Sequence, residues 1–185
     1  MQKLIWLDEY LFEHILLFAG DPILLEIAEY LVHPEKYFFV FLGLFAFALY
    51  LNKIESLWVL ATLVVLLAIN DFLVNIIKYV VARPRPGMAM GMYWQEAAYS
   101  FPSAHSANSM AMAAFFLRYV AHRQIYPAWG FLALVYSLCL GIMRIIANYH
   151  FPLDILCGFL WGWGIGNLGF KFYVIVRSYT CGYFP

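Results

Sequence analysis

Three long stretches that are almost free of charge constrain the fold of this chain more than any other feature of its sequence. They cover residues 57–77, 125–143 and 151–170, and each contains at most one charged side chain. A helix needs about 20 mainly apolar residues to cross the hydrocarbon core of a bilayer. Hydrophobic residues make up 65% of the chain and charged residues 12%, whereas soluble domains have roughly 45–50% and about 25%. The chain is therefore predicted to fold in lipid.

The pattern predicts an all-α fold, namely a polytopic transmembrane helix bundle of five or six spans. The length indicates a single membrane-embedded domain over residues 1–185, with the transmembrane bundle at 36–180. Five spans are expected, at residues 37–51, 57–77, 106–121, 125–143 and 151–170.

Residues 1–35 are too rich in acidic side chains to cross a bilayer. The first part, with Asp8, Glu9 and Glu13 on one side, is predicted to be an amphipathic helix that lies at the membrane interface. Asp21, followed by a proline, predicts the start of a second interfacial helix.

Two features of the predicted spans indicate how their helices pack. Residues 151–170 carry five glycines, which we expect to permit close approach between helices; they are Gly158, Gly162, Gly164, Gly166 and Gly169. Asn70, Asp71 and Asn75 lie within the second span and predict an inter-helix hydrogen-bond set, with a direct role in function as the alternative.

Seven polar residues stand at the ends of these spans, and all seven are expected on one face of the membrane because alternate spans run in opposite directions. They are Lys78 and Arg85 after the second span, Ser103 and His105 at the start of the third, Arg144 at the end of the fourth, and His150 and Asp154 at the start of the fifth. Ionisable residues at membrane depth are costly and usually mark a functional site. The topology therefore predicts one polar pocket.

The residue types in this pocket suit a phosphate group and nucleophilic chemistry. Lysine and arginine bind phosphate oxygens, and backbone amides at a helix start favour an anion. His150 lies at a helix N-terminus, which favours the neutral imidazole that a nucleophile needs, and Asp154 would fix its tautomer. His105 is then available as a general acid.

Three motifs in order resemble those of the type 2 phosphatidic acid phosphatase superfamily. The first is a lysine, six residues, then Arg-Pro, at 78–86; the second, Pro-Ser-Ala-His at 102–105, is similar to the family's Pro-Ser-Gly-His. The third spans 144–154, with an arginine, a histidine six residues later and an aspartate four residues after that. Two positions depart from the family pattern, because Ala104 replaces a glycine and Met143 replaces a serine.

The resemblance implies a lipid phosphatase with a phosphohistidine intermediate. In such an enzyme His150 attacks phosphorus, Asp154 orients it and His105 protonates the leaving group. The phosphate would be held by Lys78, Arg85, Ser103, Arg144 and the backbone near Ala104. Arg83, beside the first motif, is kept as a candidate contact to the substrate. The family needs neither a metal nor a cofactor.

The resemblance implies a lipid phosphate substrate within the membrane, namely lipid A 1-phosphate, phosphatidylglycerophosphate or undecaprenyl pyrophosphate. Eleven acidic and eleven basic residues cancel, so nucleic acid is not expected as a partner. Oligomeric state stays open. A phosphoryl transferase and a lipid or anion transporter with a phosphate-binding pocket are the alternatives.

Basic residues outside the motifs predict the orientation. Five lie on the side opposite the pocket, namely Lys53, Arg118, Arg123, Lys171 and Arg177, and two, Lys3 and Lys36, lie on its own side. Because basic residues favour the cytoplasm, a multi-pass protein of the bacterial inner membrane with its site facing the periplasm or exterior is expected.

Overall fold

A computed structural model describes residues 2–18, 21–31, 33, 53–86 and 99–181. This part of the chain forms helices and no strands, which confirms the all-α prediction. The helices are α1 (Gln2–Phe18), α2 (Pro22–Leu31), α4 (Lys53–Val81), α5 (Ala104–His122), α6 (Ala128–Ile146) and α7 (Pro152–Cys181).

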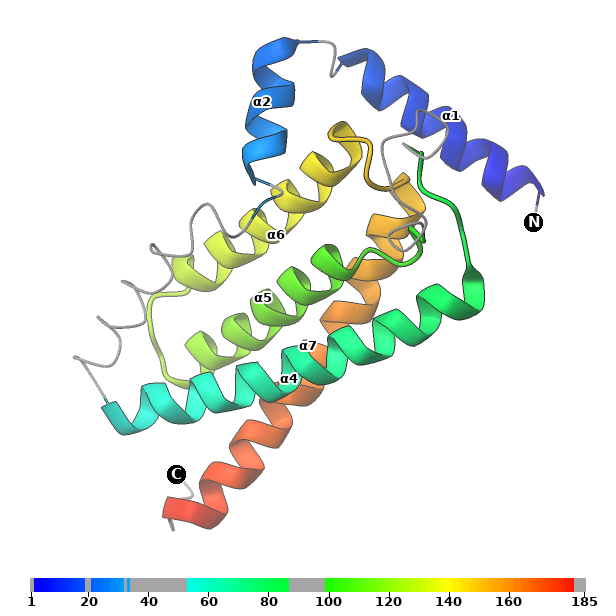
Figure 1. Cartoon of the computed structure of the whole chain (residues 1–185). Coiled ribbons are helices and arrows are strands. Elements are labelled where there is room, and N and C mark those ends of the chain that lie inside the picture. The colour runs from blue at the N-terminus through cyan, green and yellow to red at the C-terminus, as the bar shows by residue number, and fades with distance from the viewer. Residues whose placement is uncertain (1, 19–20, 32, 34–52, 87–98, 182–185) are drawn as a thin grey trace.

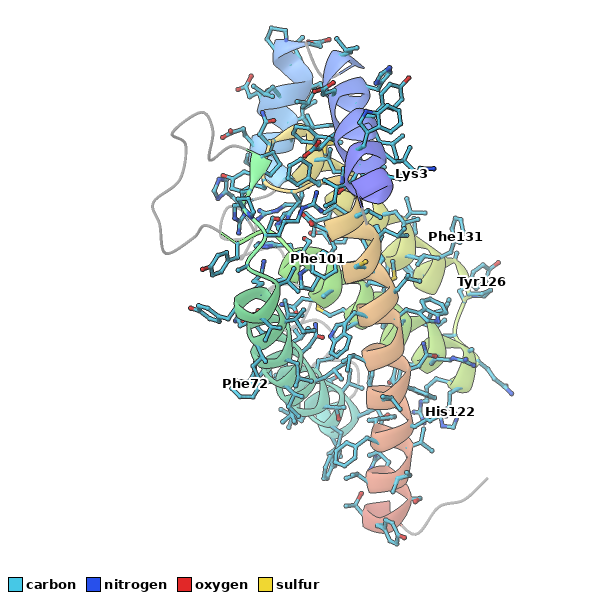
Figure 2. All side chains as sticks on the ribbon, turned by 90° about the vertical axis from the view of Figure 1, so that its right-hand side faces the viewer. Lys3, Phe72, Phe101, His122, Tyr126 and Phe131 are labelled. Atoms are coloured by element: carbon cyan, nitrogen blue, oxygen red, sulfur yellow. The ribbon has the colours of Figure 1, made fainter. Side chains whose placement is uncertain are left out.

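Helix α5 lies at the centre of the bundle, with α7, α6 and α4 packed around it (Figure 1). The short helices α1 and α2 cover the end of the bundle at which α6 ends and α7 begins, and Figure 2 shows the same grouping from the side. Aromatic side chains such as Phe72, Tyr126 and Phe131 point outward and are exposed. An apolar exterior of this kind is expected for a protein that faces lipid.

Two of the described helical stretches, Ile54–Val81 and Ala128–Ile146, are long and apolar enough by themselves to cross a membrane. Helix α5 is more polar than these two. Its neighbours enclose it, so its serines have hydrogen-bond partners within the protein; Ser109 Oγ, for example, lies 2.9 Å from Ser137 Oγ of α6. Four predicted spans thus correspond to α4–α7. The fifth, at 37–51, lies outside the described residues.

Helix α7 is longer than the sequence predicted, since it continues past residue 170 to Cys181. The prediction stopped before Lys171, but that side chain is exposed and need not interrupt the helix. Further along, Arg177 forms a 2.8 Å ion pair with Glu55 at the start of α4. This contact closes the end of the bundle that lies opposite α1 and α2.

Glycines of α7 pack directly against the backbone of α5, as predicted. A Cβ at Gly162 would lie 2.2 Å from the carbonyl oxygen of Ala107, and one at Gly166 would lie 2.3 Å from that of Ala111. Gly164 is a correction, because nothing lies within 4 Å of its Cβ position. The helices therefore approach along one face of α7, and this approach brings the start of α5 beside the start of α7.

Two of the three polar residues within α4, Asn70 and Asp71, form the predicted hydrogen bonds between helices, whereas Asn75 bonds within α4 and lines a cavity. Asn70 Nδ2 donates to Asn108 Oδ1 of α5 at 2.6 Å, and Trp161 Nε1 of α7 donates to Asn70 Oδ1 at 2.8 Å. Asn75 Nδ2 donates to Asp71 Oδ2 on the same helix at 3.1 Å. A buried amide bonded to two neighbours fixes the rotation of α4 against α5 and α7.

Candidate active site

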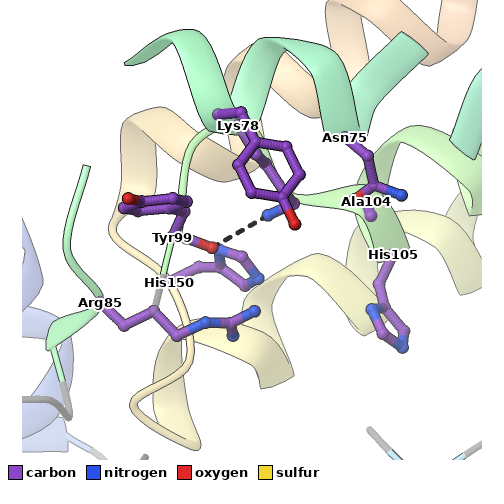
Figure 3. A pocket seen from close by; sticks show the side chains of 8 residues that line it. Asn75, Lys78, Arg85, Tyr99, Ala104, His105 and His150 are labelled. Atoms are coloured by element: carbon purple, nitrogen blue, oxygen red, sulfur yellow. Dashed lines mark hydrogen bonds between the residues drawn. The ribbon is translucent and has the colours of Figure 1, made fainter. Parts of the chain in front are cut away.

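The end of α4, the start of α5, and the segments after α4, before α5 and after α6 line a cavity of about 220 Å³ (Figure 3). Five of its lining residues were predicted as site residues, namely Lys78, Arg85, Ala104, His105 and His150. Asn75, Tyr79 and Tyr99 complete the lining. The structure thus brings together groups from all three motifs, as the topology predicted.

Two segments outside the helices join the first motif to the second. Pro84 and Tyr99 form an antiparallel bridge, and the Ser100 amide donates to the Arg83 carbonyl at 2.7 Å. Lys78 Nζ donates to the carbonyl of Tyr99 at 3.2 Å (Figure 3) and to that of Ser100 at 3.3 Å. These contacts hold the lysine at the cavity wall, because two carbonyl oxygens fix the position of its ammonium group.

The turn after α6 sets the position of His150. Asn148 adopts a left-handed conformation with φ 60°, which asparagine tolerates better than most residues. The Tyr149 amide then donates back to the Arg144 carbonyl at 3.0 Å, which closes the helix end. The chain reverses within a few residues, so the arginine and the histidine of the third motif face the same region.

His150 is buried, and its Nδ1 lies 3.5 Å from Asp154 Oδ2. Burial lowers the pKa of this imidazole well below its ordinary value, and the charges of Arg144, Arg85 and Lys78 lower it further. The ring is therefore neutral at pH 7, as the sequence predicted. The main cause of the lowered pKa is the burial of the ring, and the nearby cations add to it. The sequence argument had relied instead on the position of His150 at a helix N-terminus.

The Asp154 side chain caps the start of α7 and also lies next to the His150 ring. It is the third residue of α7, and its Oδ2 accepts from the Phe151 amide at 2.9 Å, which caps the helix. Its Oδ1 accepts from Arg83 Nη1 at 2.9 Å. The carboxylate is thus fixed by two donors while one oxygen remains near the imidazole.

Arg83 takes a different place from the one expected at the sequence level. Its guanidinium does not line the cavity; it bridges Asp154 and Asp8 of α1, with Nη2 2.6 Å from Asp8 Oδ2. It also lies over the Phe151 ring, 4.1 Å from the centroid. The structure therefore places Arg83 on the far side of Asp154 from His150, outside the lining of the cavity.

Ser103 and Arg144 also lie behind the cavity wall and are buried. Ser103 is the N-cap of α5, and its Oγ accepts from the Ser106 amide at 3.3 Å. The Arg144 guanidinium stacks on the Tyr149 ring at 4.3 Å from its centroid. Ala104, the first residue of α5, has a negative φ, so the alanine fits where the family has glycine.

Sequence reasoning did not identify Tyr149 or Asp8. Tyr149 supports Arg144, and its carbonyl accepts from Arg85 Nη1 at 3.3 Å. Its position beside His150 in the third motif was the available signal. Asp8 was assigned to the polar face of an interfacial helix, but its side chain is fully buried, and no local pattern could have indicated its partners.

Known proteins resemble this chain in sequence and in fold. A model of the PAP2 superfamily matches residues 58–177. A lipid A 1-phosphatase of Porphyromonas gingivalis is 32% identical over 118 residues, which cover 63% of this chain and 24% of that protein. The chain thus matches about a quarter of the length of this curated relative.

Two crystal structures share the fold. A transmembrane PAP2-type phosphatidylglycerolphosphate phosphatase from Bacillus subtilis superposes with a TM-score of 0.70 and 23% identity, over 97% of this chain and 89% of that one. LpxE from Aquifex aeolicus superposes with a TM-score of 0.67 and 24% identity, over 89% of this chain and 95% of that one. The fold is that of transmembrane PAP2 proteins, which confirms the predicted helix bundle in the membrane.

Proposed function

This chain belongs to the PAP2 superfamily, and from that premise we propose that it is a lipid phosphatase that removes a phosphate group through a phosphohistidine intermediate. One observation carries the proposal. A buried, neutral His150 lies in the wall of a cavity that Lys78 and Arg85 also line, and its Nδ1 is 3.5 Å from Asp154 Oδ2. A neutral imidazole beside fixed cations suits attack on a phosphate.

In the first step, His150 attacks phosphorus and the bond from phosphorus to the lipid oxygen breaks. Asp154 stabilises the ring as it becomes positive, because its carboxylate lies on the Nδ1 side. His105, which lines the same cavity, gives its proton to the departing oxygen. Lys78 and Arg85 balance the charge of the phosphoryl oxygens.

In the second step, water attacks the phosphohistidine and the bond from phosphorus to nitrogen breaks. His105, now neutral, accepts the proton of that water, so the enzyme returns to its starting state with free phosphate as product. The volume of about 220 Å³ accommodates a phosphoryl group and a few atoms of its alcohol, whereas pockets for drug-sized ligands have roughly 300–1,000 Å³. The lipid tail would remain outside the cavity.

For the substrate we favour a phosphomonoester, either lipid A 1-phosphate or phosphatidylglycerophosphate. The support is the activity in the names of the relatives from Porphyromonas gingivalis and Bacillus subtilis. Undecaprenyl pyrophosphate is the third candidate. Arg118, Arg123 and Arg177 lie in or next to the last turns of α5 and α7, whose first turns lie at the cavity. Basic residues at the opposite end support a bacterial inner-membrane protein whose site faces the periplasm.

The test is phosphate release by purified full-length protein in detergent with excess EDTA. The panel holds phosphatidylglycerophosphate, lipid A, undecaprenyl pyrophosphate and phosphatidic acid, each tested beside His150→Ala. We expect release that survives EDTA and disappears in the variant, with trapped ³²P on the wild-type protein only. The lipid with the highest kcat/KM identifies the substrate class.

Two other results would redirect the proposal. Labelled protein that releases little phosphate until an alcohol is supplied would indicate a phosphoryl transferase. Binding of lipid phosphate without labelling or release would indicate a transporter, and the lipid phosphatase would be rejected.

A further inference from the structure

Asp8 is the buried acidic residue of α1, a helix whose other acidic side chains, Glu9 and Glu13, are exposed. The exposed fraction of the Asp8 side chain is 0%. Removing a carboxylate from water is costly unless a cation and hydrogen-bond donors compensate it. The partners of Asp8 therefore indicate why a helix at the membrane interface carries a buried charge.

Both oxygens of Asp8 engage parts of the site. Oδ1 accepts from the Leu153 amide, in the first turn of α7, at 2.8 Å. Oδ2 pairs with Arg83 Nη2 at 2.6 Å. Figure 1 shows α1 beside the beginning of α7, which is the geometry that these contacts require. One carboxylate thus connects α1 to a helix N-terminus and to the segment after α4.

The guanidinium of Arg83 transmits this contact toward the nucleophile. Its Nη1 donates to Asp154 Oδ1 at 2.9 Å, while the other oxygen of Asp154 lies 3.5 Å from His150 Nδ1. A guanidinium is planar and presents its donors in a fixed fork, so a carboxylate at each end restricts its rotation. We call these three side chains the Asp8–Arg83–Asp154 bridge.

Apolar packing from α1 supports the same bridge. Arg83 lies over the Phe151 ring at 4.1 Å, and Phe12 of α1 packs against that ring with centroids 5.1 Å apart. Phe12 is buried together with Ile155 of α7. Helix α1 therefore fixes Arg83 both by charge and through the ring on which it stacks.

We propose that Asp8 is a positioning residue, which holds Arg83 against Asp154 so that Asp154 keeps His150 in the orientation for attack on phosphorus. This inference rests on the proposed phosphatase function. The cations that line the cavity, Lys78 and Arg85, are outside the bridge. Loss of Asp8 should consequently impair the chemical step and leave ground-state binding of the phosphate unchanged.

The experiment measures kcat and KM of full-length Asp8→Asn with the lipid that the wild type hydrolyses best. We expect kcat to fall by about 10- to 100-fold, the usual effect of removing a group that orients a catalytic side chain. KM should change by less than about threefold, because uniform binding is preserved. The matched control is Glu9→Gln, an exposed neighbour on the same helix, which should keep wild-type kcat.

Arg83→Gln supplies the second arm. If Asp8 acts through Arg83, Asp8→Asn should add less than about twofold to the loss in kcat that Arg83→Gln already causes, whereas independent effects would multiply. Asp8→Glu covers the case in which Asp8→Asn does not fold. It keeps the charge and moves the carboxylate, so kcat should fall at unchanged KM.

Wild-type kcat in Asp8→Asn or Asp8→Glu, multiplicative losses in the double variant, or a fall in melting temperature with no change in kcat would each overturn the proposal. A wild type that hydrolyses none of the lipids is a failure of the proposed function instead. In that event the melting temperatures of the single and double variants test the bridge alone, and additive shifts would refute it.

Discussion

Replacing Gly162 by alanine tests the helix contact that brings the two histidines to one cavity. The added Cβ would lie 2.2 Å from the carbonyl oxygen and 2.9 Å from the carbonyl carbon of Ala107. Both atoms belong to the backbone of α5, so no side-chain rotation can relieve the clash. Helix α7 has to move away from α5 by roughly 0.8 Å to restore even a 3.0 Å separation.

This displacement acts on the site because Ala107 lies one helical turn after Ser103. The Ser103 amide donates to the Asp154 carbonyl at 3.0 Å, and a further 0.8 Å exceeds the usual limit for a hydrogen bond. A misplacement of about 1 Å costs on the order of 10²-fold in rate. Overpacking of this kind costs about 1–3 kcal/mol of stability.

The assay combines kcat/KM for phosphate release with the melting temperature in detergent. Gly164→Ala is the control, because it lies two residues away on the same helix and nothing is within 4 Å of its Cβ position. This control should keep its activity and gain roughly 0.5–1 kcal/mol from the higher helix propensity of alanine. Equal behaviour of the two variants, or wild-type activity in Gly162→Ala, would refute the packing argument.

Three further predictions concern the third motif. Asp154→Asn should lower kcat by on the order of 10³–10⁴ at similar KM, since the carboxylate no longer compensates the positive ring of His150; steady-state kinetics measure this. Because the pKa of His150 is lowered in the folded protein, below about pH 6.5 this imidazole binds a proton in the unfolded chain but stays neutral in the folded one. Wild-type stability should therefore fall more than that of His150→Asn as pH drops from 7.5 to 5.5, and equal changes in melting temperature would contradict this. Tyr149→Leu should reduce kcat/KM by about 2- to 30-fold, because Arg144 loses a cation–π contact of roughly 0.5–2 kcal/mol; an unchanged kcat/KM would show that the ring has no such role.

Much of the fold could be predicted because its signals are local. An apolar length of about 20 residues and a proline after Asp21 are properties of neighbouring residues, and the helices at these places have the predicted type. The span predicted at 151–170 lies within α7, but the helix continues to Cys181, because a limit on apolar length does not set where a helix ends. Gly164 was assigned to a contact face that only the rotation of α7 in the bundle could decide.

The sequence by itself determined that the ends that carry Lys78, Arg85, His105 and His150 lie on one side of the bundle, since alternate helices run in opposite directions. Only the tertiary structure decided which charges line the cavity and which stand behind it. Asp8 and Arg83 come from segments far apart in the chain, and burial leaves each charge only the partners that packing supplies. Helix periodicity carries no information about that pairing, because it depends on how distant elements pack in three dimensions.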